Sequence, residues 1–339
     1  MTLFRTLAAA AVAMIVAGMA CAQTVGIGTG PAGSLTNNLG AVIAGVATQG
    51  TGLEVRAQPY DESQQHFALT SSGDLAFSLG NIQELRAAIN GTEQSEDSGL
   101  PNMRAVARLI DIRVGLFVRA DSGINSISEL RGKRVPVGYG SQATERYALI
   151  ALLAAGGLTT SDVVGVEVQN MDEGAAAFLE GQVGAMMSFV LDPALLRNSE
   201  AVGGITRSKR GIKMLEIPDD PDAVAAMTTA FSGASIVTTN TFDGRPGFER
   251  EHGSPLPYVD HPTRTMAYDI LIAASTETDE ELVYKVVKTL AANKNAFLVT
   301  GEPQYLSFSK DTMATQYDGV EYHPGAIRYY REMGIWPSN

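Results

Sequence analysis

A short strand that enters a glycine-rich turn and leaves it as a helix is the feature that most constrains how this chain folds. The turn lies at residues 25–34 and places Gly28, Gly30 and Gly33 where the backbone needs close approach and positive φ. Ser34 is in position to cap the helix, whose free N–H groups would then face outward and favour an anion. We predict that this turn is half of a clamp for a small carboxylate. Apolar residues follow it at helical spacing, namely Leu35, Leu39, Val42, Ile43 and Val46.

Two other interpretations of the same turn stay open. The glycine spacing also fits a dinucleotide-binding fingerprint, which requires an acidic residue at the end of the second strand, about 20 residues further on. Glu54 has that distance but stands near the start of the predicted strand 53–57, and an exported chain is separated from nicotinamide cofactors. The remaining interpretation is a tight strand–helix turn that binds nothing.

Residues 1–22 are predicted to be a signal peptide. A positively charged start, an apolar stretch at 7–19 and the small residues 20–22 favour cleavage before Gln23. The alternative is a lipid-modified N-terminus at Cys21, because the residues before it resemble a lipoprotein box. Cys21 is the only cysteine, so cleavage leaves no thiol for a disulfide, a nucleophile or a metal site. No later apolar run reaches the ~18 residues of a spanning helix, and we expect a periplasmic protein.

The amino-acid composition and the net charge limit which classes of partner the protein can bind. The net charge is −12, and removal of Arg5 with the signal peptide makes it −13. An acidic chain without tracts rich in Lys and Arg is a poor nucleic-acid binder, so no nucleic-acid partner is expected. The net negative charge of the chain repels anions at long range. A carboxylate site must therefore rely on hydrogen-bond donors within the site itself. With 45% hydrophobic residues in 339, the chain has material for a packed core of about two domains.

The rest of the chain alternates between strands and helices, which predicts a parallel sheet covered by helices. Because ligands bind such sheets at the C-terminal ends of the strands, residues 60–63 and 78–81 are expected beside the glycine turn. The opening arrangement recurs in a second unit, where the strand 134–138 runs into a small-residue turn at 139–144 and a helix that ends at Gly156. Two such turns, one in each half, are what a two-lobed clamp requires.

The predicted elements can be stated by range. Residues 219–265 carry few periodic runs and receive no assignment. Pro324 is predicted at the first position of the last helix, after His323. The expected strands are 53–57, 75–79, 114–118, 163–168, 184–190, 212–217 and 268–274, and the expected helices are 63–70, 82–90, 172–180, 193–197 and 280–298.

Three segments together resemble a known family. They are residues 28–34, 121–135 and 322–334, of which the last is the most specific. They are similar to the TAXI class of substrate-binding proteins of TRAP (tripartite ATP-independent periplasmic) transporters, over essentially the whole mature chain. The resemblance implies an α/β fold of the type II periplasmic binding protein class, with two α/β lobes around a central cleft joined by a hinge. Lobe I would contain 23–112 and 266–339, and lobe II would contain 113–265.

The resemblance also implies a function and a set of ligand-binding positions. The protein would be a monomer that closes on a small organic acid, carboxylate or amino-acid-like, and delivers it to TRAP membrane subunits. Carried over by position, the pocket would use Thr29, Gly30, Ala32, Gly33, Ser34, Leu35, Ser63, Ser78 and Asn81 from lobe I, and Gly140, Ser141, Gln142, Ala143, Thr144, Phe189, Val190 and Pro193 from lobe II.

Three further residues are candidates on their own chemistry. Arg146, just inside the second-lobe helix, could supply a charge-assisted donor to a carboxylate, or it could pair with Glu145 or Glu173. Tyr60 and Tyr139 stand at predicted strand ends and could close over a ligand, or pack at a lobe interface.

Catalytic chemistry finds no support in the sequence. The four histidines show no metal-ligand spacing, and the serine at 141 lies outside a GxSxG motif with no identifiable His and Asp partners. We therefore expect no catalytic residues, metal or cofactor. Two alternatives stay open: the same fold serving a periplasmic sensor or an ABC-type permease, and a periplasmic enzyme.

Overall fold

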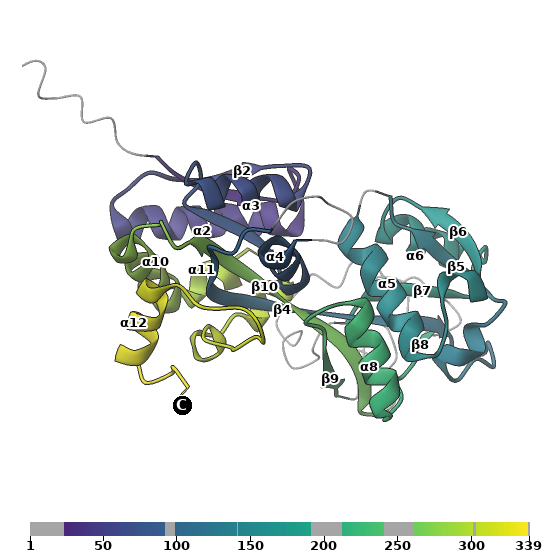
Figure 1. Ribbon diagram of the computed structural model, residues 1–339. Coiled ribbons are helices and arrows are strands. Elements are labelled where there is room, and N and C mark those ends of the chain that lie inside the picture. Colours follow the sequence, from purple (N-terminus) through teal and green to yellow (C-terminus); the bar gives the residue numbers. More distant parts are fainter. Residues whose placement is uncertain are drawn as a thin grey trace, which may run out of the picture.

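The computed structural model describes residues 24–91, 99–140, 142–190, 212–240, 261–300 and 303–337. Two α/β bodies lie side by side and are joined by a pair of long strands (Figure 1). This arrangement confirms the predicted two-lobed α/β fold. The predicted signal peptide at 1–22, the predicted helix 193–197, and the candidate residues Ser141 and Pro193 lie outside the described residues.

Lobe I is built on a sheet in the order β2-β1-β3-β10-β4. β1 pairs in parallel with both β2 and β3, whereas β10 is antiparallel to β3 and β4. The insertion of a returning antiparallel strand into a parallel sheet is the strand order of the type II class. The lobe contains β1 (Val25–Thr29), α2 (Leu35–Thr51), β2 (Val55–Pro59), α3 (Ser63–Ser72), β3 (Phe77–Asn81), α4 (Ile82–Asn90), α10 (Glu280–Ala292), α11 (Lys294–Leu298) and α12 (Pro324–Glu332).

Lobe II repeats the strand–turn–helix unit of lobe I. The β5–β6 pair is parallel, and β7 and β8 each pair with the end of β4. The lobe contains β5 (Arg134–Gly138), α5 (Ala143–Ala155), β6 (Val164–Val168), α6 (Met171–Leu179), β7 (Ala185–Phe189), β8 (Ile212–Met214), α8 (Pro221–Ala230) and β9 (Ser235–Thr239).

Two long strands, β4 (Met103–Arg119) and β10 (Thr263–Ser275), pass from one lobe to the other. They pair antiparallel, with Val114 opposite Met266. The predicted strand 114–118 is therefore the end of a 17-residue strand and does not start a separate unit. The predicted lobe boundaries, before residue 113 and after residue 265, lie close to the Val114–Met266 pair. The division of the chain into these two lobes stays a prediction.

Other sequence-based boundaries need correction. The predicted helix 280–298 is two helices, because Asn293 leaves helical geometry at φ −119°, ψ 41° between α10 and α11. The unassigned segment 219–265 contains α8 and β9. β2 and β3 each begin two residues later than predicted. Among the described residues, no helix is both long and apolar enough to cross a membrane.

The last helix begins as the sequence predicts. Pro324 is its first residue, and the Nδ1 of His323 accepts the Gly325 N–H at 3.2 Å. Pro fits this position because the N–H that it lacks would have no intrahelical partner. The cap is held in place because the other ring nitrogen of His323 contacts the Thr278 carbonyl at 3.1 Å.

Gly325 lets α12 approach α10, and we expect Gly325→Ala to lower the free energy of unfolding by about 1–3 kcal/mol. An added Cβ would lie 2.3 Å from the Glu280 carbonyl oxygen, which is backbone and cannot rotate away. Chemical denaturation measures the effect. Gly45→Ala is the matched control, because Gly45 is an exposed helical position of α2 with no atom within 4 Å of the added Cβ. That variant should gain about 0.5–1 kcal/mol. An equal response of both variants would contradict close packing at Gly325.

Candidate functional site

The glycine turn of lobe I leads from the end of β1 into α2. Ser34 is the N-cap of α2, as predicted, and its Oγ accepts the Asn37 N–H at 3.2 Å. Gly33 has φ +80°, a conformation that requires glycine in practice. Thr29 is buried, whereas Ala32 and Gly33 are exposed. The turn therefore presents backbone at the surface of the lobe, at the C-terminal edge of the sheet.

Side chains at the start of α2 accept hydrogen bonds from two backbone N–H groups of this turn. The Gly30 N–H donates to Thr36 Oγ1 at 3.2 Å, and the Gly33 N–H donates to Asn37 Oδ1 at 3.1 Å. The Asn37 Nδ2 also donates to Thr29 Oγ1 at 3.0 Å. Thr36 and Asn37, in the first turn of α2, thus occupy the N–H groups of Gly30 and Gly33. The predicted anion site at the start of α2 stays a prediction.

Three further lobe I candidates lie on or next to the neighbouring elements β2, α3 and β3. Tyr60 follows β2, is half-buried, and donates its hydroxyl to Gln58 Oε1 at 3.2 Å. Ser63 is the first residue of α3. Ser78 is fully buried, and its Oγ lies 2.6 Å from Thr70 Oγ1 and 2.9 Å from the carbonyl of His66. The Ser78 hydroxyl is thus engaged between β3 and α3 inside the lobe.

Direct contact between the lobes involves two predicted residues, Asn81 and Thr144. Asn81 ends β3 and caps α4, and Thr144 lies in the first turn of α5. The Asn81 Nδ2 donates to Thr144 Oγ1 at 3.1 Å, and the Thr144 hydroxyl lies 3.2 Å from Glu84 Oε1 as donor. Glu84 also accepts the Asn81 N–H at 2.8 Å, while Asn81 Oδ1 accepts the Glu84 N–H at 2.9 Å. We call these three residues, joined by four hydrogen bonds, the cross-lobe ring.

A second carboxyl lies close to the cross-lobe ring. Glu145 follows Thr144 in α5, and burial, together with the charge of Glu84, raises the pKa of Glu145 to about 7. Burial also raises the pKa of Glu84, although hydrogen bonds from Asn81 and Thr144 oppose that rise. Burial and the two carboxylates raise the pKa of the Tyr268 hydroxyl well above its usual range. Negative charge thus gathers where the lobes meet.

The second-lobe turn is held by its own contacts. Tyr139 has φ +49°, the only positive φ of a non-glycine residue in the part of the chain that the structure describes. Its side chain is 1% exposed and is therefore packed in the interior. The Gly140 N–H donates to the Val168 carbonyl at 3.2 Å. Gln142 Oε1 accepts the Met171 N–H at 2.9 Å, which ties the turn to α6.

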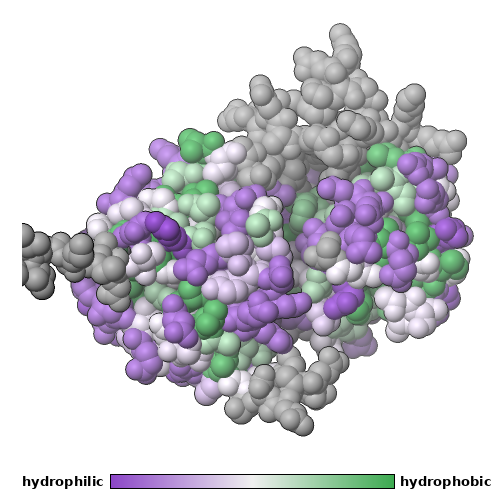
Figure 2. All heavy atoms as spheres, turned by 90° about the horizontal axis from the view of Figure 1, so that it is seen from above, coloured by the Kyte–Doolittle hydropathy of each residue, from purple (hydrophilic) through white to green (hydrophobic). Residues whose placement is uncertain are grey.

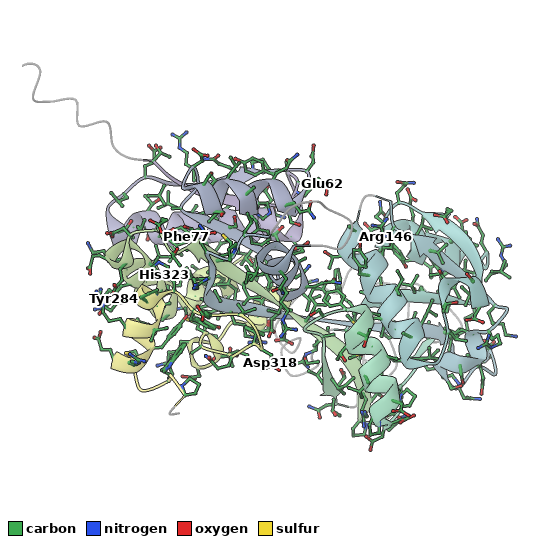
Figure 3. All side chains as sticks on the ribbon, in the orientation of Figure 1. Glu62, Phe77, Arg146, Tyr284, Asp318 and His323 are labelled. Atoms are coloured by element: carbon green, nitrogen blue, oxygen red, sulfur yellow. The ribbon has the colours of Figure 1, made fainter. Side chains whose placement is uncertain are left out.

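The remaining lobe II candidates are dispersed. Arg146 is exposed, with its guanidinium 5.3 Å from the centre of the Tyr147 ring. Among the described residues, Arg146 forms no ion pair with Glu145 or Glu173 in this conformation. Figure 3 shows Arg146 and Glu62 on opposite sides of the boundary between the lobes. Ala143 is the first residue of α5 and is exposed, Phe189 ends β7, and Val190 is buried.

Glu84 and Glu145 are the residues that sequence analysis missed. Asn81 and Glu84 have the spacing of a capping box, an N-cap residue followed three positions later by Glu, which would have located the first of them. Nothing local predicts that Glu145 faces it, because the two are 61 positions apart. Among the described residues, no group of three or more His, Cys, Asp or Glu side chains is arranged to hold a metal ion.

Comparison with known proteins places the chain in a family. Residues 27–243 and 252–334 match the NMT1-like family, and the chain belongs to it.

Similar solved structures include MatC from Rhodopseudomonas palustris with bound malate, at 17% identity, a TM-score of 0.48, and coverage of 92% of this chain and 97% of that one. A TctC solute-binding protein from Polaromonas without ligand has 15% identity, a TM-score of 0.48, and coverage of 92% and 96%. PhnD1 from Prochlorococcus marinus in complex with methylphosphonate has 10% identity, a TM-score of 0.47, and coverage of 92% and 99%.

Proposed function

We propose that the protein is an extracytoplasmic solute-binding protein that captures a small organic acid, carboxylate or amino-acid-like, by hinge closure. The observation that supports this best is the cross-lobe ring, because it joins the N-terminus of α4 in lobe I to that of α5 in lobe II. The strand pair β4–β10 connects the same two lobes. Two bodies that meet at helix N-termini and are linked by two strands have the parts needed for hinge closure.

The charges at the cleft bear on which acid is bound. A simple carboxylate would have to approach Glu84 and Glu145, whereas an ammonium group would be attracted by them. Helix N-termini, including that of α2 behind the glycine turn, favour the carboxylate end of the same molecule. Of the two chemistries, the amino-acid-like ligand fits this arrangement better.

Delivery to TRAP membrane subunits, action as a monomer and a periplasmic location belong to the same proposal. They rest on the resemblance of residues 28–34, 121–135 and 322–334 to the TAXI class. Membership of the NMT1-like family is compatible with a solute-binding role. Hydrophilic side chains cover much of both lobes in the view from above (Figure 2), as expected of a protein that meets solvent on this face.

A thermal-shift screen of ligand-stripped protein tests the proposal. The panel contains monocarboxylates, dicarboxylates, amino acids and, as a contrast, the corresponding amines. A ligand at 100 times its Kd should add about 2.7 kcal/mol to the free energy of unfolding, which raises the Tm by several degrees. We expect the largest rise with an amino acid or another small acid that also carries an ammonium group.

Variants separate binding in the cleft from binding elsewhere. Thr144→Val removes the hydroxyl between the lobes at nearly constant volume and should weaken the response at least tenfold in Kd, whereas Thr159→Val, at a 3-10 helix of lobe II, should leave the Kd unchanged. Rises only with amines would overturn the acid assignment. No rise with any member of the panel would contradict solute capture of this kind.

A further inference from the structure

Three side chains and a neighbouring carboxyl control how the lobes meet. In the cross-lobe ring, Glu84 contacts Asn81 in its own lobe and Thr144 in the other lobe through its two carboxylate oxygens. It therefore holds two predicted ligand-binding residues at once. A neutral side chain could accept the same hydrogen bonds, but an ionised carboxylate accepts them more strongly.

Closure also brings Glu145 into the electrostatic reach of Glu84, which lies on the other lobe. Two carboxylates brought together in a partly buried place resist being charged at the same time. In the proposed hinge motion, opening would break the contact of α4 with α5 and expose both groups to water. The charge state of the pair would then differ between the open and the closed arrangement.

The other charged and titratable groups around the pair do not remove this conflict. Arg86 of α4 donates to the Ser232 hydroxyl at 3.0 Å and to the Asp318 carbonyl at 2.8 Å. Arg146 lies over the Tyr147 ring. The hydroxyls of Tyr139 and Tyr268 have pKa values raised by burial and by nearby carboxylates, so they stay neutral. No ion pair of either glutamate is formed among the described residues.

We propose that Glu84 is a positioning residue that holds Asn81 and Thr144 across the lobe boundary, and that closure of the lobes takes up one proton, shared by Glu84 and Glu145. This inference rests on the proposed hinge closure and adds a regulation to it. Acidification favours the closed form, and alkaline solution favours the open form.

The size of the effect follows from linkage. The pKa of Glu145 is about 7 in this arrangement, against 4.5 for the free group. If opening restores the ordinary value, the closed-to-open ratio should fall on the order of 70-fold between pH 5 and pH 8. A partial restoration gives a smaller change, and tenfold is the least that we expect.

Distance measurements between spin labels test the inference. Cys21 is the only native cysteine, so Cys21→Ser gives a background free of competing thiols. Labels at Gln64→Cys in α3 and Asp172→Cys in α6 occupy exposed helix positions on different lobes. In ligand-free protein, the fraction of short distances should be larger at pH 5 than at pH 8, with a ratio that changes tenfold or more.

Variants identify the groups responsible. Glu145→Gln should remain closed at both pH values, because the neutral amide has no proton to lose. Glu84→Gln should reduce the pH dependence without abolishing it, because it removes the charge of Glu84 but leaves the burial that raises the pKa of Glu145. It serves if Glu145→Gln does not fold, and an unchanged pH dependence in it would contradict a proton shared by the two groups. Glu173→Gln, an exposed first-turn glutamate of α6, should follow the unmodified protein, as should His261→Gln at an exposed imidazole.

The outcomes separate this inference from the proposed function. Two distance populations whose ratio does not change with pH, or a pH dependence that survives in Glu145→Gln, would overturn proton-linked closure and leave solute capture standing. A single distance at both pH values would overturn the inference as well. If that distance also stayed unchanged with the acid and amino-acid panel, hinge closure itself would fail.

Discussion

Replacing Arg108 by methionine is expected to lower the free energy of unfolding by about 3–5 kcal/mol, because it leaves the largely buried Asp269 without its cation and Asp111 with Arg113 alone. The Arg108 Nε lies 2.8 Å from Asp269 Oδ1, and its Nη2 lies 3.1 Å from Asp111 Oδ1. Asp111 and Asp269 stand directly opposite each other on β4 and β10, where two like charges destabilise a sheet. Their side chains are only 12% and 19% exposed.

The pKa values of this cluster agree with strong pairing. Burial alone would lower the pKa of the Arg108 guanidinium, but Asp269 and Asp111 outweigh it and raise that pKa. Burial would likewise raise the pKa of Asp111, but Arg113 and Arg108 lower it. Denaturant unfolding at neutral pH measures the loss. Lys285→Met is the control, because its pair with Glu281 at 3.8 Å is half-exposed and should contribute at most about 0.5 kcal/mol. A loss below 1 kcal/mol for Arg108→Met would show that the cluster is well solvated.

Acidification should destabilise the protein through His66 by about 3 kcal/mol. Burial lowers the pKa of His66 from 6.5 to about 4, and the residue is 1% exposed. Between these two pH values the unfolded chain binds a proton that the folded chain excludes. The free energy of unfolding is therefore unaffected by this group above pH 6.5, falls as the pH decreases towards 4, and falls no further below it. A pKa difference of one between the folded and the unfolded chain corresponds to about 1.36 kcal/mol.

The comparison that isolates His66 is the difference between the unmodified protein and His66→Gln across this range. Carboxylates that titrate in the same window contribute equally to both and cancel. The variant should lose less stability than the unmodified protein between pH 7 and pH 4, whatever its stability at pH 7. His261→Gln should track the unmodified protein, since His261 is exposed. Parallel curves for the unmodified protein and His66→Gln would contradict a neutral, buried His66.

Local rules of chain geometry predicted the helix ends well. Ser34 caps α2, and Pro324 begins α12, because both effects depend only on a few adjacent residues. Gly156 ends α5 for the same reason. The alternation of strands and helices also gave the fold class, since the period of apolar residues reflects which faces are buried.

Such local rules could not predict contacts between residues that are far apart in the sequence. β4 was predicted only from residue 114, because Arg108, Asp111 and Arg113 interrupt its apolar pattern. The three pair with one another inside the sheet, and Arg108 also pairs with Asp269 of β10, which is far away in the sequence. The contact of Asn81 with Thr144 joins residues 63 positions apart. In the candidate site, the N–H groups of Gly30 and Gly33 donate to the side chains of Thr36 and Asn37. The spacing of residues in the sequence does not predict how those side chains are oriented.

In the described residues, the two lobes are connected by two paired strands, β4 and β10. If a solute is captured by hinge closure, as proposed, it must supply the free energy that bends these strands near the Val114–Met266 pair, so its apparent Kd equals the intrinsic Kd divided by the fraction of molecules already bent. The stiffness of the strand pair, to which the ion cluster of Arg108 contributes, would then scale the affinity for every solute by the same factor. Selection acting on residues that never touch a solute can thus match the protein to the concentration at which that solute occurs.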